Sequence, residues 1–223
     1  MEGIQIDTIL GTLARKRKIF HSEGDFQFSL GCEIQSLTNM KVIIERPMNS
    51  NNNATEHIDM YVYNEQIKIG IELKFIKDKF SGIVDSNYYC LKPSSAYDMR
   101  CYDIVKDIQR LEDYVENENK DEQIDIGYAI VLTNAKNLWT PKTNEKEYNY
   151  DEFRVFDGRE IHGEMKWKPA TGDGTKKGRT NSIRLKDNNT YLIQWKYYSE
   201  PKAEAEAGNS NKNLFKYMFV EVR

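Results

Sequence analysis

The 223-residue sequence lacks any long hydrophobic run. A transmembrane helix needs about 18 or more consecutive apolar residues, and no window of that length is present. The N-terminal segment places an apolar patch before the basic run ARKRK, which reverses the order found in a secretory signal peptide. We therefore expect a cytoplasmic protein that has no membrane partner.

Residues that build common metal and redox sites are also scarce. The chain has three cysteines and three histidines, contains no CxxC pair, and places no histidine at zinc-site spacing from a cysteine. The odd number of cysteines fits a reducing compartment, and Cys32, Cys90 and Cys101 are expected to be buried structural thiols. The segment TGDGTKKGR lacks the GxxxxGK[ST] spacing of a phosphate-binding loop. Zinc enzymes and P-loop nucleotide hydrolases are therefore not indicated.

No excess of positive charge is present, since the formal net charge is −3. This excludes a protein that is basic over its whole surface, as many nucleic-acid-binding proteins are. The charges are nevertheless uneven: residues 14–18 and 166–186 are basic, whereas residues 112–125 are acidic. A local positive strip is sufficient for a catalytic face that binds DNA. The alternative is that these runs are solvated loops and helix faces.

The spacing of apolar residues predicts an α/β core over residues 1–149. Spacings of three and four predict helices, alternation predicts strands, and a continuous apolar run predicts a strand buried on both faces. Ser22 is expected to cap the second helix, and Pro47 to end the first strand. The predicted order is helices at 4–18 and 22–37, strands at 40–47, 57–63 and 67–75, a loop at 76–94, a helix at 95–117 and an apolar strand at 126–133.

Residues 150–223 are predicted to form a β-rich extension that packs on the core as one domain. One hairpin is expected about the turn Asp157-Gly158 and another about residues 187–189. A last strand is expected at residues 214–222. The predicted architecture is thus an αβββαβ core, a mixed sheet flanked by helices, with a C-terminal elaboration.

The strand IGIELKF at residues 69–75 contains the first candidate site residues. Strict alternation points its four large apolar side chains into a core, and Glu72 and Lys74 to the opposite face. Four Glu-x-Lys triplets occur in the chain, so the triplet alone carries no functional information. Glu72 and Lys74 could be a solvated ion pair, or they could be half of a metal-dependent catalytic site.

Asp59 distinguishes this triplet from the other three. In the preceding strand HIDMYVY, alternation predicts that Ile58, Met60 and Val62 face the core and that Asp59 faces away. Because the two strands are expected to pair as a hairpin, residues of one face should lie side by side. Asp59 is therefore expected on the face that carries Glu72.

Two registers of the hairpin are compatible with this pattern. If Tyr63 lies opposite Gln66, Asp59 is a diagonal neighbour of Glu72 at about 7–8 Å, whereas a turn longer by two residues places the two carboxylates directly opposite each other. A slip of one residue would turn Asp59 into the core. Both registers keep the cluster together, and Gly70 is expected to leave space beside it.

Such a cluster has a defined chemistry. Two carboxylates a few ångströms apart repel each other unless a cation bridges them. Oxygen ligands without histidine or cysteine select Mg²⁺, for which Mn²⁺ can substitute. A bound cation makes water a better nucleophile, and a nearby lysine orients that water or stabilises developing negative charge. The cluster therefore indicates phosphodiester hydrolysis.

Two glutamates of the predicted helix 22–37 are further candidates. Glu33 lies three residues after Leu30 and four before Leu37, on the apolar stripe of that helix, and Glu23 lies on nearly the same line. An inward carboxylate is costly without a partner, and a metal or its bound water would be one. Glu23 could equally be a favourable acid in a first helical turn, and Glu33 could be a residue at the rim of the core.

These features together resemble the PD-(D/E)xK nuclease superfamily, which has the restriction-endonuclease-like fold. The resemblance covers roughly residues 20–135 and depends on the helix glutamates, on Asp59 in HIDMYVY, and on Glu72 and Lys74 in IELKF. Ile58 stands where the superfamily has proline. The chain is also similar to a group of bacterial proteins that share the segments HSE-x-DFQ, IELK, YD-x-x-x-DIQRLE and LTN.

The resemblance implies a metal-dependent nuclease. The metal ligands would be Asp59, Glu72 and the carbonyl of Leu73, Lys74 would be the catalytic lysine, and Glu23 or Glu33 would contact the metal or its water. The superfamily also contains inactive members. The alternative is therefore a catalytically silent protein on the same fold that binds nucleic acid or has a regulatory role.

The expected partner is nucleic acid, most simply DNA, and a homodimer is a further expectation, because nucleases of this fold often cut two strands as dimers. Candidate phosphate contacts are basic residues of the predicted helix 95–117 and of the lysine-rich segment: Arg100, Arg110, Lys176, Lys177 and Arg179. For the helix residues the alternative is a set of surface ion pairs with Asp103 and Asp107 at spacings of three, four and seven.

Overall fold

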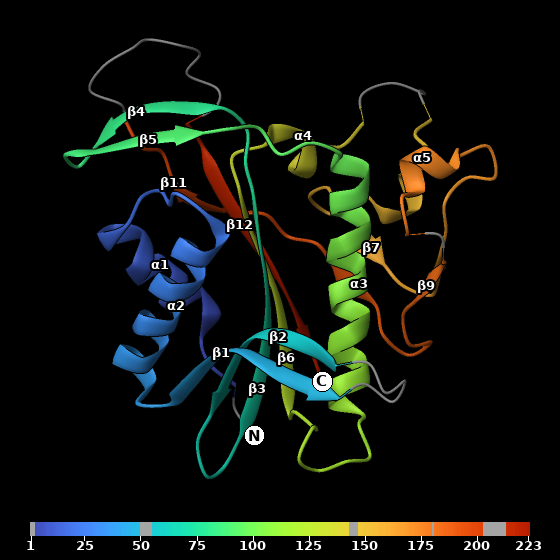
Figure 1. Ribbon diagram of the computed structural model, residues 1–223, viewed down its shortest axis with the longest axis horizontal. Coiled ribbons are helices and arrows are strands. Elements are labelled where there is room, and N and C mark those ends of the chain that lie inside the picture. The colour runs from blue at the N-terminus through green and yellow to red at the C-terminus, as the bar shows by residue number, and fades with distance from the viewer. Residues whose placement is uncertain (1–2, 50–54, 143–146, 180, 203–212) are drawn as a thin grey trace.

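The computed structural model contains a six-stranded mixed sheet at the centre of the molecule (Figure 1). It describes residues 3–49, 55–142, 147–179, 181–202 and 213–223. The strand order is β1-β2-β3-β6-β12-β11; β3 and β6 run parallel, and the other neighbours are antiparallel. The bounds are β1 Lys41–Asn49, β2 Thr55–Tyr63, β3 Lys68–Ile76, β6 Ile126–Thr133, β11 Lys196–Ser199 and β12 Phe215–Val222. The predicted α/β class with a mixed sheet and flanking helices is confirmed.

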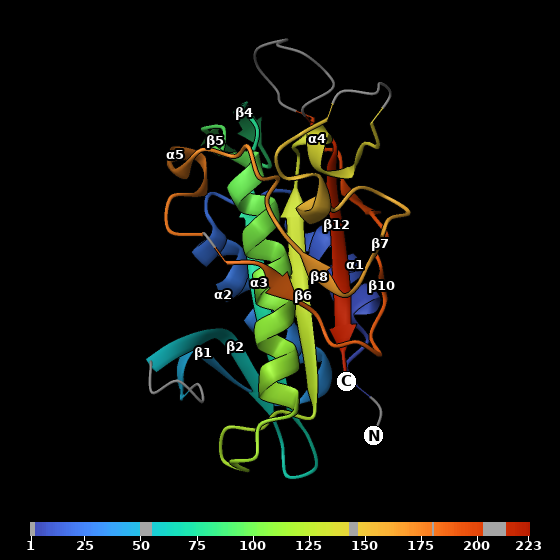
Figure 2. The same cartoon turned by 90° about the vertical axis from the view of Figure 1, so that its right-hand side faces the viewer.

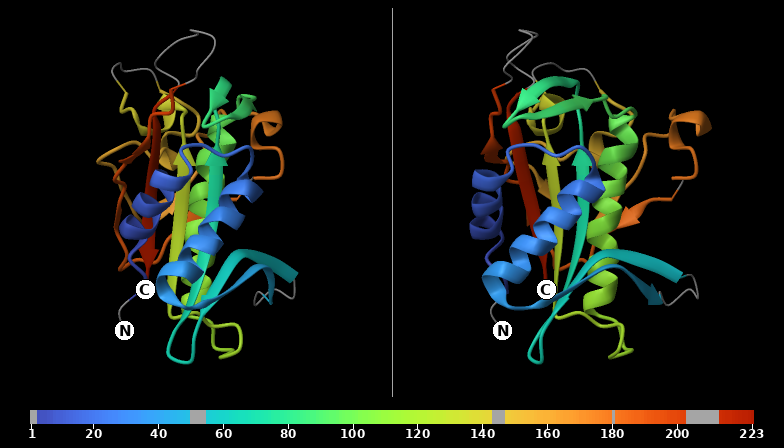
Figure 3. Two further views of the ribbon diagram at one scale, coloured as in Figure 1. Left: turned by 90° about the vertical axis from the view of Figure 1, so that its left-hand side faces the viewer. Right: turned by 60° about the vertical axis from the view of Figure 1, so that its left-hand side comes forward.

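Two helices cover one face of the sheet (Figure 3). They are α1, Ile6–Lys16, and α2, Glu23–Thr38, close to their predicted bounds. Ser22 caps α2 as expected, because its hydroxyl accepts a hydrogen bond from the Asp25 N–H at 3.1 Å. The apolar side chains of β3 that were predicted to face a core do so here, packed with α1 and α2 in one cluster.

A third helix, α3 (Tyr97–Val115), covers the opposite face and contacts β6, β3 and β12 (Figure 2). β6 is buried at every position, as its apolar run predicted. Leu111 of α3 lies so close to Gly127 of β6 that a Cβ on the glycine would be 2.8 Å from the leucine Cβ. The close approach of helix and strand therefore requires glycine at this position.

The β1–β2 hairpin is kinked at Asp59, which the alternation did not predict. Glu45 has a φ of 53°, and the ladder between the two strands skips the Glu45–Asp59 pair. Met60 lies in the cluster under α1 and α2, but Ile58 packs in the cluster under α3. The predicted common face of Ile58 and Met60 is therefore wrong, because the kink rotates the outer half of the strand towards α3.

The expected space at Gly70 is also filled. A Cβ at Gly70 would lie 2.4 Å from Cδ1 of Ile58 and 2.7 Å from Cδ1 of Ile124. The glycine therefore admits two apolar side chains under α3 and leaves no gap beside the charged residues. Pro47 lies inside β1 and does not end it, because β1 is an edge strand in which the missing N–H leaves no ladder bond unmade.

The segment after β3 forms a hairpin where a loop was predicted. Strands β4 (Phe80–Val84) and β5 (Asn87–Leu91) pair around Asp85 and Ser86, whose φ angles are 49° and 66°. Positive φ at both central residues is the geometry of a tight two-residue turn, which glycine or asparagine usually signals. Asp-Ser is a weaker signal, so the strands were missed.

The C-terminal third departs most from the prediction. The two expected hairpins are wrong: β7 (Glu160–Ile161) pairs with β10 (Tyr191–Leu192), and β8 (Glu164–Met165) pairs with β9 (Ile183–Arg184). These pairs join distant segments, which local turn patterns cannot reveal. The last predicted strand is confirmed as β12, and it pairs along β6 within the main sheet. The remaining short elements are α4 Lys136–Trp139, a 3₁₀ turn at Asp151–Phe153 and α5 Asp173–Lys176.

The cysteines were predicted to be buried, and this holds for one of them. Cys101 lies inside the α3 core, and burial raises the pKa of its thiol to about 12. Cys32 and Cys90 are exposed, so the prediction is wrong for these two. Within the described ranges, no helix has the length and apolar character needed to cross a membrane.

Candidate active site

Asp59, Glu72 and Lys74 come together beside β3. β2 and β3 pair from Tyr63 opposite Lys68 to Met60 opposite Ile71, which is the longer-turn register and puts Asp59 in line with Glu72. Beyond Met60 the backbone of β2 no longer bonds β3. The Leu73 N–H donates instead to the Asp59 side chain, at 2.6 Å from its Oδ2. The kink in β2 thus turns a backbone ladder position into a side-chain contact.

Helix α3 supplies a counter-charge to each of the two β3 residues. The Lys74 Nζ lies 2.7 Å from Oδ2 of Asp107, and it also donates to the Leu73 carbonyl at 3.1 Å. Arg110, one helical turn further along, donates from Nη2 to Oε1 of Glu72 at 2.6 Å. The face of β3 that carries the charges is therefore covered by a helix and is not solvated.

Burial dominates the electrostatics of Glu72, whose residue is 2% exposed. Burial raises the pKa of Glu72 well above its ordinary value, the carboxylates of Asp107 and Asp59 raise it further, and Arg110 and Lys74 oppose the increase. Burial likewise raises the pKa of Asp107, to about 6, against the effect of Lys74. Without a further cation, both carboxyl groups are therefore biased towards their neutral, protonated forms.

Lys74 stays protonated in this setting. Burial alone would lower its pKa, but the carboxylates of Asp107, Asp59 and Glu72 outweigh burial and raise it. A lysine of this kind donates hydrogen bonds and stabilises negative charge, and it cannot act as a general base near neutral pH.

Helix α2 approaches the same edge of β3 with two side chains. Glu23 Oε2 accepts a hydrogen bond from the Phe75 N–H at 2.7 Å, two residues beyond the bond that Asp59 receives. Gln27 donates to the Asp59 carbonyl at 2.6 Å and to Oε1 of Glu45 at 3.1 Å, which secures the kink in β2. Glu23 therefore lies beside the cluster, where the prediction that it contacts the metal or its water needs it to be.

Glu33, the other helix glutamate, is buried but has a different partner. Both of its carboxylate oxygens accept hydrogen bonds from Lys16 of α1, at 2.9 and 2.7 Å. Its position on the inward stripe was predicted correctly, but Leu37 at the end of that stripe is exposed. Since the Lys16 ion pair offsets the buried charge, Glu33 needs no metal to explain its burial.

The donor chemistry of the cluster suits Mg²⁺ or Mn²⁺. No donor in the described ranges bonds to Glu72 Oε2 or to Asp59 Oδ1, so each carboxylate keeps one oxygen for a cation. Four carboxylates face two cations, a net charge of −2 when all are ionised: Glu56, Asp59, Glu72 and Asp107 against Lys74 and Arg110. Among the residues that the structure describes, no three His, Cys, Asp or Glu side chains are already arranged to hold a metal ion.

The candidate phosphate-binding residues fall into two places. Arg110 lies inside the cluster. Arg179 makes two contacts with Asp103 of α3, at 2.5 and 2.9 Å, and Arg100 lies 3.9 Å from the same carboxylate. This second patch is about 10–15 Å from Arg110 along the helix axis, at 1.5 Å per residue. Lys176 lies 4.0 Å from Asp173 on α5, and Lys177, which follows that helix, is exposed.

Asp107 was the site residue that sequence reasoning did not single out. It was grouped with surface ion pairs of α3, yet it is buried against Lys74. Asp107 lies three residues after Ile104 and four before Leu111, both of which are buried, so it belongs to the inward stripe. Asp107 thus has the same signal on α3, an acid on an apolar stripe, that Glu33 has on α2.

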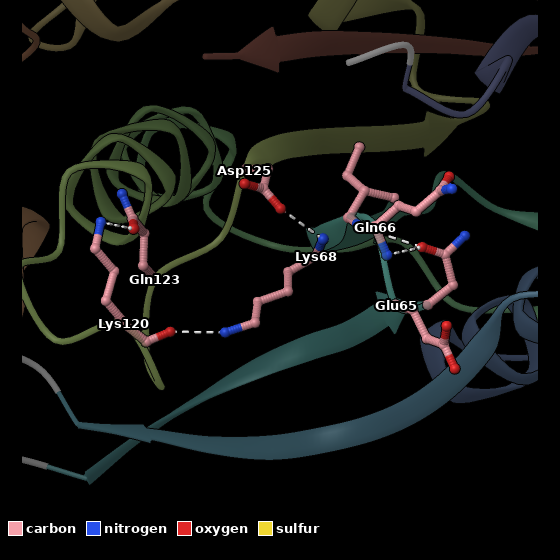
Figure 4. Close-up of a pocket in the computed structure, with 8 residues that line it drawn as sticks. Glu65, Gln66, Lys68, Lys120, Gln123 and Asp125 are labelled. Carbon is pink, nitrogen blue, oxygen red and sulfur yellow. Dashed lines mark hydrogen bonds between the residues drawn. The ribbon is translucent and has the colours of Figure 1, made fainter.

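A hollow near the start of β3 lies apart from this cluster (Figure 4). Its volume is about 350 Å³, and polar residues of the β2–β3 turn and of the α3–β6 connection line it. Its lysines already have partners: Lys68 donates to the Lys120 carbonyl at 2.6 Å, and Lys120 donates to Gln123 at 2.7 Å. Both lysines are therefore held by neutral oxygens in the wall of the hollow.

Comparisons with protein-family models, with curated proteins and with solved structures found no match for this chain.

Proposed function

We propose that the protein is a Mg²⁺-dependent nuclease of the PD-(D/E)xK type, with the restriction-endonuclease-like fold, that hydrolyses phosphodiester bonds of DNA. The observation that carries the proposal is the gathering of Asp59, Glu72 and Asp107 around Lys74, at the point where β2 leaves β3. Asp59, Glu72 and the Leu73 carbonyl would hold the cation, and Mn²⁺ would substitute for Mg²⁺. The bound cation supplies the charge that makes water more acidic and screens the phosphate.

The residues of the chain have separate tasks in this proposal. Lys74 remains cationic and would stabilise negative charge on the phosphate, with Asp107 fixing its direction. Asp59 and Glu72 each keep one oxygen to which no donor of the described residues bonds. Glu23, already bonded to the Phe75 N–H, lies at the rim of the cluster, where it would orient water.

A cleavage assay with matched variants tests the proposal. The purified protein is incubated with duplex DNA, single-stranded DNA and RNA in Mg²⁺ or Mn²⁺, beside Glu72→Ala and Lys74→Ala. The control pair is Glu164→Ala and Lys166→Ala, a second Glu-x-Lys triplet that lies exposed on β8, with its own 3.0 Å ion pair. Cleavage should disappear in the first pair and persist in the second. Cleavage that survives both β3 substitutions would refute the assignment.

A second candidate function is a catalytically silent nucleic-acid-binding or regulatory protein on the same fold. It is favoured by the ion pairs Lys74–Asp107 and Glu72–Arg110, at 2.7 and 2.6 Å, which partly neutralise the cluster without a metal. Calorimetry with Mn²⁺ separates the two candidates. A nuclease should bind Mn²⁺ and lose this binding in Asp59→Ala, whereas a silent protein should bind none, even with DNA present.

A further inference from the structure

We infer that Arg110 is the resident counter-cation of Glu72 and that a divalent cation must compete with its guanidinium for that carboxylate. This inference rests on the proposed metal-dependent function and adds a control on metal affinity that comes from α3. Arg110 is thereby a positioning residue, because it acts on the metal through Glu72.

The contacts of Arg110 are concentrated on one nitrogen. Nη2 donates both to Glu72 Oε1 at 2.6 Å and to the His57 carbonyl at 2.7 Å. Nε, by contrast, is buried and has no hydrogen-bond partner among the described residues. A guanidinium with an unused buried donor is incompletely satisfied in this position, which lowers the cost of moving it.

Two other carboxylates lie within reach of the displaced guanidinium. Oε2 of Glu56 is 3.5 Å from Nε, and Oδ1 of Asp107 is 3.8 Å from Nη1. Both distances are longer than a hydrogen bond with good geometry, so a small shift would tighten them. Arg110 can therefore break its ion pair with Glu72 without becoming an unpaired buried cation.

A buried glutamate with a structural role looks different in this protein. Glu112 is also on α3 and almost fully buried, and its carboxylate accepts hydrogen bonds from the Lys186 N–H, the Asn189 amide and the Tyr191 hydroxyl. These are neutral donors that saturate the carboxylate. Within the described part of the chain, Glu72 receives one hydrogen bond, from a cation, and that is the arrangement a second cation can replace.

The sign of the effect follows from Coulomb's law. A guanidinium that bonds one oxygen of Glu72 would repel a divalent cation held by the other oxygen. Removal of the positive charge should therefore tighten metal binding by about tenfold or more. If Arg110 only orients Glu72 for the metal, its removal should weaken binding instead.

The test is isothermal titration calorimetry with Mn²⁺ alone, without nucleic acid. Four proteins are compared: the wild type, Arg110→Gln, Arg110→Lys and the control Lys106→Gln. Lys106 is exposed on the same helix, where it bonds Gln109, so the control removes the same charge outside the cluster. Arg110→Gln should bind Mn²⁺ at least about tenfold tighter, and the other two variants should stay within about threefold of the wild type.

A second measurement uses the wild type and covers the case in which Arg110→Gln does not fold. In protein labelled with ¹⁵N-arginine, the Nε signal of Arg110 is assigned by its absence in Arg110→Lys. Addition of Mg²⁺ should shift this signal, because the guanidinium leaves Glu72. An unchanged signal at saturating Mg²⁺ would overturn the inference.

The outcomes separate this inference from the proposed function. If the wild type binds Mn²⁺ and Arg110→Gln binds it equally or more weakly, competition by Arg110 is refuted and the metal site remains. If no protein binds Mn²⁺, even when DNA is added, the metal-dependent function fails and the inference fails with it.

Discussion

Replacement of Arg110 by methionine should destabilise the metal-free protein in a way that depends on pH. Methionine keeps most of the side-chain volume but removes the cation that bonds Glu72 directly. Removal of one partner of a buried ion pair typically costs about 3–5 kcal/mol, because the remaining charge is uncompensated. The lower end of that range is expected, since Lys74 also acts on Glu72 and the Arg110 side chain is 21% exposed.

Protonation of Glu72 limits this cost. The folded protein can neutralise the Glu72 carboxylate by taking up a proton. Protonation of a glutamate costs about 1.4 kcal/mol for each pH unit above its ordinary pKa of 4.5. The loss of stability caused by Arg110→Met therefore cannot exceed about 5 kcal/mol near pH 8 or about 0.7 kcal/mol near pH 5. Burial raises the pKa of Glu72 in the folded state, so the folded state binds more protons than the unfolded state, and stability falls as pH rises above 4.5. The loss caused by Arg110→Met should therefore be about 3 kcal/mol or more near pH 8 and under about 1 kcal/mol near pH 5.

Urea denaturation followed by circular dichroism at the two pH values measures this difference. The control is Lys106→Met, which removes an exposed positive charge from the same helix and should change stability by less than about 0.5 kcal/mol. A loss that is equal at both pH values would show that packing, and not the charge of Glu72, explains the effect. A loss under about 1 kcal/mol near pH 8 would show that Glu72 does not depend on Arg110.

Three further predictions concern the anchor of the C-terminal region, helix packing and the metal. Glu112→Ala removes the shared acceptor of three half-buried donors and should cost about 3 kcal/mol in urea denaturation, whereas exposed Glu116→Ala should cost little. Equal losses would contradict the anchoring role. Gly127→Ala should lower stability by about 1–3 kcal/mol because its Cβ would meet Leu111, whereas Gly11→Ala, with open space in α1, should raise it by up to about 1 kcal/mol; the same sign for both would be inconsistent with the packing argument. Mn²⁺ at about 100 times its Kd should stabilise the wild type by about 2.7 kcal/mol, seen as a higher melting temperature, and should not stabilise Asp59→Ala. An equal rise of the melting temperature in both proteins would place the metal elsewhere.

Elements with strong local signals were predicted well. α2 begins where Ser22 provides a cap, and α3 follows a stripe of apolar residues at spacings of three and four. β6 was recognised from its uninterrupted apolar run. In each case the information lies within one element, because periodicity and capping depend on neighbours a few residues apart.

Elements that depend on distant partners were predicted poorly. The pairs β7–β10 and β8–β9 each join segments that are far apart in the sequence, so the Asp-Gly turn at Gly158 misled the prediction. The kink at Asp59 depends on Glu45 of the neighbouring strand and on Gln27 of α2. Such features arise from contacts between elements, which a single sequence does not specify.

In the candidate site, too, some features follow from local sequence patterns and others from contacts between distant elements. The sequence by itself determined that Asp59, Glu72 and Lys74 gather, because alternation and a short hairpin are local properties and either even register keeps their faces aligned. Only the tertiary structure decided which charges meet them. Asp107 and Arg110 reach the cluster because α3 packs across β3. Glu33 forms an ion pair with Lys16 because α1 packs beside α2. The partner of a buried charge is set by the packing of whole helices, and that packing depends on the entire core.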